Sequence, residues 1–485
     1  MPHAYTEDQL VEQPAIGLFA ELGWQVVSAL EETFGANGTL GRETSGEVVL
    51  VGRLRAALER LNPALPPEAI AAAVDELTRD RSAMSLAIRI RLSSFCILKD
   101  AASPELLEKV RGYGNSAQAE INKMAQNDFL CVNMGVGKEI ILSFVEGMAL
   151  GSYQFLKYRK DREERKNALS TLHVLDPLLK ESDLEEVQNL VRATCLARDL
   201  VNEPVSYLTA ATFSKEMQKA GKAHGFSVKV LHKKEIEDHK MGGLLAVNAG
   251  SIDPPTFNIM EYKSPKAKNK TPIVLVGKGV VFDTGGLSLK PTPGSMDEMK
   301  CDMAGAAAVV GAMSAIAANK LPLYVIALVP STDNRPGMNA VCPQDVITIS
   351  DGTTVEVMNT DAEGRLILAD ALVYAKKYKP QLVMDFATLT GAAVRAVGTY
   401  ASAVMGTAND REFAKLDKSG MQVWERNMRF PLWKDYGDEM KSDVADLKNL
   451  GGANAGHISA GKFLEHFTDY PWIHVDICLL YTSPS

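Results

Sequence analysis

The apolar positions of this chain follow two spacings that alternate along its middle and later parts. Uninterrupted apolar runs at 273–276 and 323–329 lack polar alternation, which predicts strands covered on both faces. Apolar residues at helical spacing occupy 184–201, 304–319 and 366–377. Because strands and helices come in turn, the pattern predicts an α/β fold in which a layered mixed sheet is flanked by helices.

The remaining predicted elements are shorter. They comprise strands at 227–231, 258–262 and 382–385, a helix at 233–241, and an upstream group of helices at 105–113, 116–126 and 140–150 with a strand at 129–134. We interpret the upstream group as a truncated, smaller α/β domain over residues 88–176. A charged, solvated helix at 157–166 would join it to a larger domain over residues 177–477.

Residues 1–87 differ from the rest of the chain because they are rich in Glu, Ala and Leu at helical spacing. Leu54, Leu58 and Leu61 mark one predicted helix, and a second lies at 68–77. No stretch rich in Gly, Pro or Ser separates this region from residue 88 onward. The sequence therefore lacks the kind of linker that usually joins two domains.

Length, composition and charge limit the number of domains and the classes of function. A length of 485 residues exceeds what one hydrophobic core usually serves, and 46% hydrophobic with 23% charged residues is ordinary for globular domains. The net charge of −8 argues against binding of nucleic acid or anionic membranes as the main function. We predict no membrane span and no signal peptide. The six cysteines lack C-x-x-C spacing, which indicates reduced thiols in a cytoplasmic protein.

Candidate chemistry begins at Asp361, Glu363 and Arg365, in a loop that leaves a β-branched run and enters the helix at 366–377. Loops of this kind carry sites in α/β folds. In extended backbone, residues two apart point the same way, so we expect the two carboxylates and the guanidinium to converge. Taken alone, the pattern also fits a solvated charged loop.

A second stretch, upstream, changes this interpretation. Lys278 and Asp283 follow two buried strands, Lys290 follows a Gly-Gly turn, and Asp302 precedes a helix of small residues. Buried charge of this extent needs ion pairing or a metal. The G-x-x-x-x-G-K-[ST] pattern of phosphate-binding loops is absent. Structural ion pairs stay open as an alternative, but the two stretches together favour a metal site, with Lys278 as a neutral ligand and protonated Lys290 stabilising an oxyanion.

The stretches VGKGVVFDTGG, SMDEMKCDMAGAA and NTDAEGRL resemble the leucyl aminopeptidase family, the two-metal cytosolic aminopeptidases. Supporting matches are ARDLVNEP, DFATLTGA and NLGG, and the resemblance covers roughly residues 95–477. It implies a metallo-exopeptidase that releases N-terminal amino acids, leucine-like ones preferred, from peptides by attack of a metal-bridging hydroxide. It also implies a cytoplasmic homo-oligomer, a hexamer.

The same resemblance assigns roles to individual residues. Two divalent ions, Mn or Zn, would be held by Lys278, Asp283, Asp302, Asp361 and Glu363. The first ion would bind Asp283, Asp361 and Glu363, and the second would bind Lys278, Asp283, Asp302 and Glu363. Lys290 and Arg365 would be catalytic, with Arg365 holding a bicarbonate that acts as general base.

The two ends of the chain lie outside this resemblance. Residues 1–87 resemble the extreme N-terminus of the R subunit of type I restriction enzymes, and their abrupt join at Ala87 suggests an artificial junction. Residues 478–483 are what a transposon end used in sequencing libraries would encode, so we interpret 478–485 as adapter read-through. Two other functions stay open: a non-catalytic metal- or DNA-binding member of the family, and a component of a type I restriction system.

Overall fold

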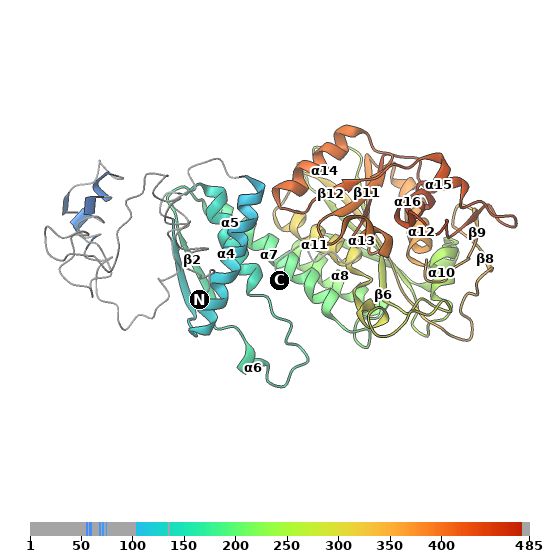
Figure 1. The fold of residues 1–485 in the computed structure, drawn as a ribbon, viewed down its shortest axis with the longest axis horizontal. Helices are drawn as coiled ribbons and strands as arrows, with labels where there is room; N and C mark the ends of the chain where they lie inside the picture. The colour runs from blue at the N-terminus through green and yellow to red at the C-terminus, as the bar shows by residue number, and fades with distance from the viewer. Residues whose placement is uncertain are drawn as a thin grey trace, which may run out of the picture. The chain divides into compact units, whose positions relative to one another are not determined.

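The computed structural model describes residues 103–133 and 136–477, together with scattered positions between 55 and 74 (Figure 1). The chain divides into two compact units, Met1–Ile88 and Arg89–Ser485. The described positions of the first unit are helical. All elements named below belong to the second unit.

Some predicted segments fall outside the described residues. Most of the region 1–87 and all of 478–485 do so, and the predicted strand at 129–134 is described as far as residue 133. The predicted charged helix at 157–166 is largely wrong, because only α6 (Arg162–Arg165) is helical there. Arg159 and Arg165 pair locally with Asp161 instead, whereas Lys157 pairs with the distant Glu203.

The first elements of the second unit form a small layer of two helices on two strands. α4 (Pro104–Lys123) and α5 (Lys138–Gly151) pack on a parallel pair, β1 (Asp128–Val132) and β2 (Thr171–Leu175). The buried apolar residues of this layer include Val110, Ile121, Ile140 and Met148. Both helices thus turn one apolar side toward the strands.

The predicted break between helices at 105–113 and 116–126 is wrong, because α4 runs through Gly114 without interruption. A Cβ atom on Gly114 would overlap the carbonyl oxygen of Phe144 in α5. The glycine therefore permits a close approach of two helices. From the sequence alone, a glycine such as Gly114 indicates a possible helix end.

The larger part of the unit is a nine-stranded mixed sheet. Its strands lie in the order β12-β11-β14-β10-β5-β7-β4-β3, and β6 also pairs with β7. In chain order they are β3 (Ser227–Leu231), β4 (Thr256–Lys263), β5 (Ile273–Gly277), β6 (Gly279–Asp283), β7 (Tyr324–Asn334), β10 (Leu382–Ala387), β11 (Ser402–Gly406), β12 (Asn427–Arg429) and β14 (Trp472–Asp476). The central strands β14, β10, β5 and β7 are parallel, whereas β11 and β4 are antiparallel to β14 and β7. The predicted α/β layered mixed sheet is confirmed.

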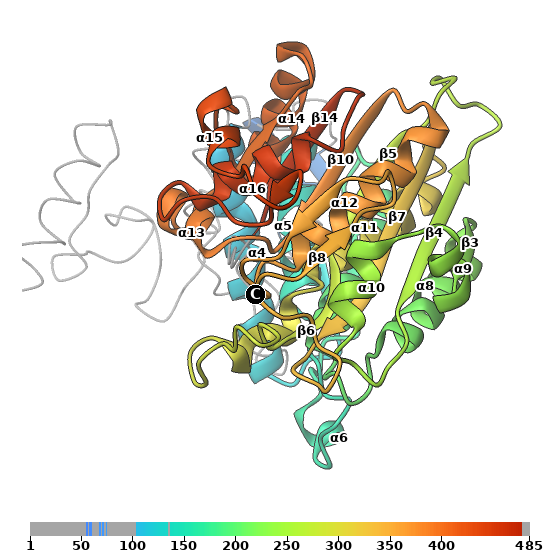
Figure 2. The ribbon, with the colours of Figure 1, turned by 90° about the vertical axis from the view of Figure 1, so that its right-hand side faces the viewer.

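Helices cover both faces of this sheet, whose strands β14, β10, β5, β7 and β4 lie side by side in Figure 2. One face packs on α7 (Glu181–Asn202), α8 (Ala210–His224) and α11 (Ala304–Ala318), and the other on α10 (Gly242–Asn248), α12 (Gly364–Ala375) and α16 (Gly456–Glu465). Along β5, Val274 and Val276 belong to the core with α12, and Leu275 to the core with α11. The uninterrupted apolar pattern of this strand thus reflects burial on both faces.

The remaining elements are short. They are α9 (Lys233–Asp238), η4 (Met296–Cys301), η5 (Lys376–Tyr378), α13 (Gly391–Val397), α14 (Asp410–Gln422) and α15 (Lys434–Asp438). A separate three-stranded sheet has the order β13-β9-β8, with β8 (Val346–Thr348), β9 (Thr354–Glu356) and β13 (Leu447–Lys448). This small sheet brings a late segment of the chain beside the loop that leaves β9.

Candidate metal centre

Lys278 and Asp283 lie where two consecutive strands end, at the carboxyl edge of the large sheet. β5 ends at Gly277, and β6 ends at Asp283 itself. Each of the two charged residues is 2% exposed. The backbone N–H of Lys278 donates to the carbonyl oxygen of Phe386 in β10 at 3.0 Å. Because parallel strands end at a common edge, loops from several parts of the chain meet here.

The amine of Lys278 is surrounded by oxygen atoms. Its Nζ lies 2.8 Å from Oδ1 of Asp302 and 2.8 Å from Oε1 of Glu363, and it donates to the carbonyl oxygen of Thr388 at 2.9 Å. The hydroxyl of Thr388 donates to Oδ1 of Asp302 at 2.8 Å. Burial alone would lower the pKa of Lys278, but the surrounding carboxylates, led by Asp302, outweigh it and hold that pKa well above its usual value.

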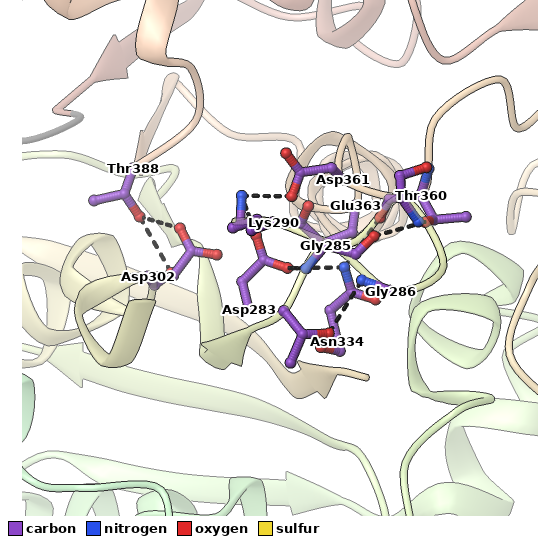
Figure 3. A network of polar contacts seen from close by, with 12 residues as sticks. Asp283, Gly285, Gly286, Lys290, Asp302, Asn334, Thr360, Asp361, Glu363 and Thr388 are labelled. Carbon is purple, nitrogen blue, oxygen red and sulfur yellow. Dashed lines mark hydrogen bonds and ion pairs between the residues drawn. The ribbon is translucent and has the colours of Figure 1, made fainter. Parts of the chain in front are cut away.

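Three carboxylates form the centre of the site. Oxygen atoms of Asp283, Asp361 and Glu363 all lie within 4.8 Å of one another. Nζ of Lys290 lies 2.9 Å from Oδ2 of Asp283 and forms a second ion pair with Asp361 (Figure 3). Burial, together with the charges of Asp283 and Glu363, raises the pKa of Asp361 to about 6. Burial opposes the charge of Lys290, but its two carboxylate partners raise its pKa above the usual value.

Two polar residues outside the predicted set of ligands support this centre, and one of them, Asn334, lies outside every quoted motif. Asn334, at the end of β7, donates from Nδ2 to Oδ1 of Asp283 at 2.8 Å and to the carbonyl oxygen of Thr360 at 3.0 Å. The hydroxyl of Thr360 donates to the carbonyl oxygen of Gly285 at 2.6 Å (Figure 3). Such contacts fix the orientation of a ligand. The signal available in sequence was the polar end of β7, STDN, after an apolar run.

The loop that carries Asp361 and Glu363 does not have the predicted extended backbone. The side-chain oxygen of Asn359 accepts the backbone N–H of Asp361 at 2.8 Å, which makes a turn, and α12 already begins at Gly364. A Cβ atom on Gly364 would overlap the side chain of Lys278, so glycine lets the helix start against that lysine. The two carboxylates converge as predicted, but they do so through a turn. The predicted cause, alternation along extended backbone, is wrong.

Arg365 lies in the first turn of α12 and is 5% exposed. Its Nη1 donates to the carbonyl oxygen of Asn449 at 2.8 Å. Nε has no hydrogen-bond partner among the residues that the structure describes. Burial lowers the pKa of Arg365 to about 10, which leaves the guanidinium protonated at neutral pH. The charges of Glu363 and Asp476 favour this protonated form.

The residues of the site fit divalent cations. Four largely buried carboxylates (Asp283, Asp302, Asp361 and Glu363) face the two ammonium groups of Lys278 and Lys290, which leaves an excess of negative charge. Within the described part of the chain, the buried Oδ2 atom of Asp302 has no hydrogen-bond partner. A buried oxygen atom without a hydrogen-bond partner is costly, although the other oxygen of this carboxylate pairs with Lys278. Carboxylate oxygens with one amine nitrogen suit Mn²⁺ or Zn²⁺.

A second buried polar group lies on the neighbouring strands β10 and β14. Asp385 and His474 are opposite each other in the register of this pair, and Nδ1 of His474 lies 2.6 Å from Oδ1 of Asp385. The indole N–H of Trp472 donates to Oδ2 of Asp385 at 2.7 Å. All three residues are 0% exposed. The spacing of histidines along the sequence cannot reveal a pair of this kind, because it forms across two strands.

Comparison with known protein families finds two matches. The profile of the cytosol aminopeptidase family, catalytic domain, matches residues 195–483. The profile of the type I restriction enzyme R protein N terminus matches residues 4–133. The second match confirms the resemblance noted for the N-terminal region and extends past residue 87 into α4 and β1.

Relatives and solved structures agree with the first match. A probable cytosol aminopeptidase of Chlorobium phaeobacteroides is 48% identical over 355 residues, which are 70% of this chain and 70% of the relative. One of Chlorobaculum tepidum is 49% identical over 355 residues, again 70% of each chain. The Mn complex of the bottromycin maturation enzyme BotP has a TM-score of 0.71 at 34% identity, covering 77% of this chain and 80% of its own. A mutant of tomato leucine aminopeptidase has a TM-score of 0.71 at 32% identity, covering 78% and 75%. The chain therefore belongs to the cytosol aminopeptidase family, the metal-dependent aminopeptidases of the leucyl type.

Proposed function

We propose that this chain releases N-terminal amino acids, leucine-like ones preferred, from peptides by hydrolysis at a centre for two divalent cations. The observation that carries the proposal is the convergence of Asp283, Asp361 and Glu363 beside Lys278 and Lys290. Membership of the family supports the substrate class. The Mn complex of a structural neighbour supports the use of divalent metal.

The residues that would hold the cations form two overlapping sets. Asp283, Asp361 and Glu363 would hold the first, and Lys278, Asp283, Asp302 and Glu363 would hold the second. When bound, the cations supply Lewis acidity to the scissile carbonyl and to the attacking water. Lys278 would join the second set only as the neutral amine, so its ammonium group must first give up a proton.

Lys290 and Arg365 would act on the reacting groups. The side chain of Lys290 is 15% exposed, against 3% for that of Lys278. The ammonium group of Lys290 would stabilise the negative charge that develops on the carbonyl oxygen of the substrate. The buried guanidinium of Arg365 would hold a bicarbonate ion. When bound, that ion would supply a general base.

Further proposals concern the chain as a whole. We propose a cytoplasmic homo-hexamer, on the ground of the family resemblance and of relatives named cytosol aminopeptidases. The division into an aminopeptidase N-terminal domain at 88–176, a catalytic domain at 177–477 and foreign segments at 1–87 and 478–485 stays a prediction. Light scattering of the purified chain measures the oligomer.

The test of the function is a set of assays on the purified chain. With Mn²⁺ added, a leucine chromogenic amide should be hydrolysed, and its N-acetylated form should not, because the free amine is required for binding. Exhaustive chelation should abolish the activity, and Mn²⁺ should restore it. Equal hydrolysis of the two amides would contradict an exopeptidase. ATP-dependent DNA cleavage would instead indicate a restriction component.

A further inference from the structure

We propose that Asn449 is a positioning residue of the peptidase site, which acts through the loop that carries Asp361 and Glu363 and through the guanidinium of Arg365. The inference rests on the proposed function, and it assigns a role to a residue outside the metal ligands. Asn449 lies in a segment more than 80 positions after those ligands in the sequence.

The small three-stranded sheet brings Asn449 to the site. Strand β13 pairs in parallel with β9, and the backbone N–H of Asn449 continues this ladder by donating to the carbonyl oxygen of Glu356 at 3.0 Å. Asn449 is the first residue after β13, and it is 0% exposed. Its side chain therefore lies against the backbone that leaves β9 and leads to the metal ligands.

The side-chain amide of Asn449 bonds that backbone at four points. Oδ1 accepts the N–H groups of Met358 at 2.8 Å and Asn359 at 3.3 Å. Nδ2 donates to the carbonyl oxygens of Asn359 at 2.8 Å and Ala362 at 3.5 Å. An amide offers two acceptor sites and two donor hydrogens, so this pattern uses its full capacity. The loop between β9 and α12 thus closes around one side chain, with Asp361 inside the closed segment.

The backbone of Asn449 makes the second connection. Its carbonyl oxygen accepts from Nη1 of Arg365 at 2.8 Å. This is a charge-assisted bond to a guanidinium that is 5% exposed, so it fixes the direction in which the rest of that group points. The same residue therefore sets the position of two metal ligands and of the buried cation beside them.

Asn258 provides a matched control within the chain. It is also an asparagine with 0% exposure, and its Nδ2 donates to the carbonyl oxygen of Val329 at 3.1 Å and to the hydroxyl of Thr256 at 3.2 Å. These partners lie in β4 and β7, apart from the loop at 358–362. A role in stability alone would make Asn258→Ala and Asn449→Ala alike, whereas positioning would separate them.

The experiment compares kcat, KM and Mn²⁺ affinity for the full chain and these variants. At saturating Mn²⁺, Asn449→Ala should lower kcat by about 10- to 100-fold and weaken Mn²⁺ binding, with a smaller change in KM, as for other residues that orient metal ligands. Asn258→Ala should keep the kcat and Mn²⁺ affinity of the unchanged chain. The bond from Arg365 to the backbone carbonyl of Asn449 is retained in Asn449→Ala, so the losses would report on the four side-chain bonds to the ligand loop.

The outcomes separate the inference from the proposed function. Equal kcat and Mn²⁺ affinity in the Asn449→Ala and Asn258→Ala variants would overturn the positioning role. An unchanged chain without peptidase activity would overturn the function, while Mn²⁺ affinity would still test Asn449. If Asn449→Ala does not fold, Asn449→Asp keeps the two accepted bonds and loses the two donated ones. The same losses are then expected, and retention of kcat would contradict the role.

Discussion

Nζ of Lys278 lies 2.8 Å from Oδ1 of Asp302, and both residues are at most 4% exposed. This ion pair occupies the position in which a neutral amine and a carboxylate would share a cation. The raised pKa of Lys278 means that its amine keeps its proton as long as the surrounding carboxylates are ionised and pair with the ammonium group. If Lys278 binds the cation as proposed, cation binding at this centre releases a proton.

We accordingly expect Mn²⁺ binding to the metal-free chain to release protons and to strengthen as pH rises. The pKa of about 6 for Asp361 in the metal-free site means that protons compete with the cation below that pH. Affinity should therefore fall as pH decreases through 6, and the amine of Lys278 should still release its proton at pH 8. Calorimetry in buffers of different ionisation enthalpy measures this release. Binding without any proton release at pH 8 would exclude Lys278 as a ligand.

Lys290→Ala and Arg365→Ala should lower kcat without loss of metal, whereas Asp361→Ala should lower the metal content. The first two remove groups that act on the transition state, so they should retain bound metal and lose kcat, by about 10²- to 10³-fold for Lys290. Asp361→Ala removes a carboxylate of the cluster and should lose metal.

Metal content and kcat are measured on the same preparations, with the exposed Lys418→Ala as control for loss of a lysine. The same loss of metal in all three site variants would contradict these roles.

Asp385→Asn should destabilise the chain in a pH-dependent way. Burial would lower the pKa of His474, but Asp385 outweighs it and raises that pKa above its ordinary value of 6.5. A raised pKa in the folded state contributes stability that is fully present below pH 6.5 and is lost as pH rises through the folded value. The variant should thus lose about 3–5 kcal/mol at low pH, as for other broken buried pairs.

The loss should become smaller as pH rises toward 9 through the folded-state pKa of His474, because a neutral imidazole and Trp472 can still donate to Asp385. Urea unfolding at both pH values measures the difference. An equal loss at the two values would show that His474 does not titrate with folding.

Alanine substitutions at two glycines of α4, Gly112 and Gly114, test the close contact between α4 and α5. Gly112→Ala meets open space, so it should stabilise the helix by about 0.5–1 kcal/mol. Gly114→Ala would overlap the carbonyl oxygen of Phe144 and should destabilise the α4–α5 pair by about 1–3 kcal/mol. Hydrogen exchange of α4 and α5 measures both changes. Identical exchange in the two variants would contradict the close helix contact.

The sequence was sufficient for the parts of the site that are local. Lys278 and Asp283 follow apolar runs within one short stretch, Glu363 lies in a strand-to-helix loop, and the ends of parallel strands bring such stretches together. It was not sufficient for contacts across long separations. Asn449 reaches the ligand loop through a two-residue strand, and no local pattern marks a strand that short.

Errors in the predicted elements have a common origin. Gly114 lies in the predicted gap between the helices at 105–113 and 116–126, yet α4 is continuous there and the missing side chain permits contact with α5. Asp361 was placed in extended backbone because its neighbours alternate, yet the side chain of Asn359 makes a turn there. In both cases a tertiary or side-chain contact outweighs the local preference on which the prediction depended.

Removal of residues 1–87 should leave kcat/KM of the remaining chain within a few-fold. Every residue of the metal centre lies between Lys278 and Asn449, in the unit Arg89–Ser485. No group in the first unit is needed to complete the two proposed sets of ligands. A chain beginning near Ser93 is therefore assayed with the leucine amide after limited proteolysis of the full chain. Protection of residues 1–87 from protease, combined with loss of activity when they are removed, would show that they form a functional part of the enzyme.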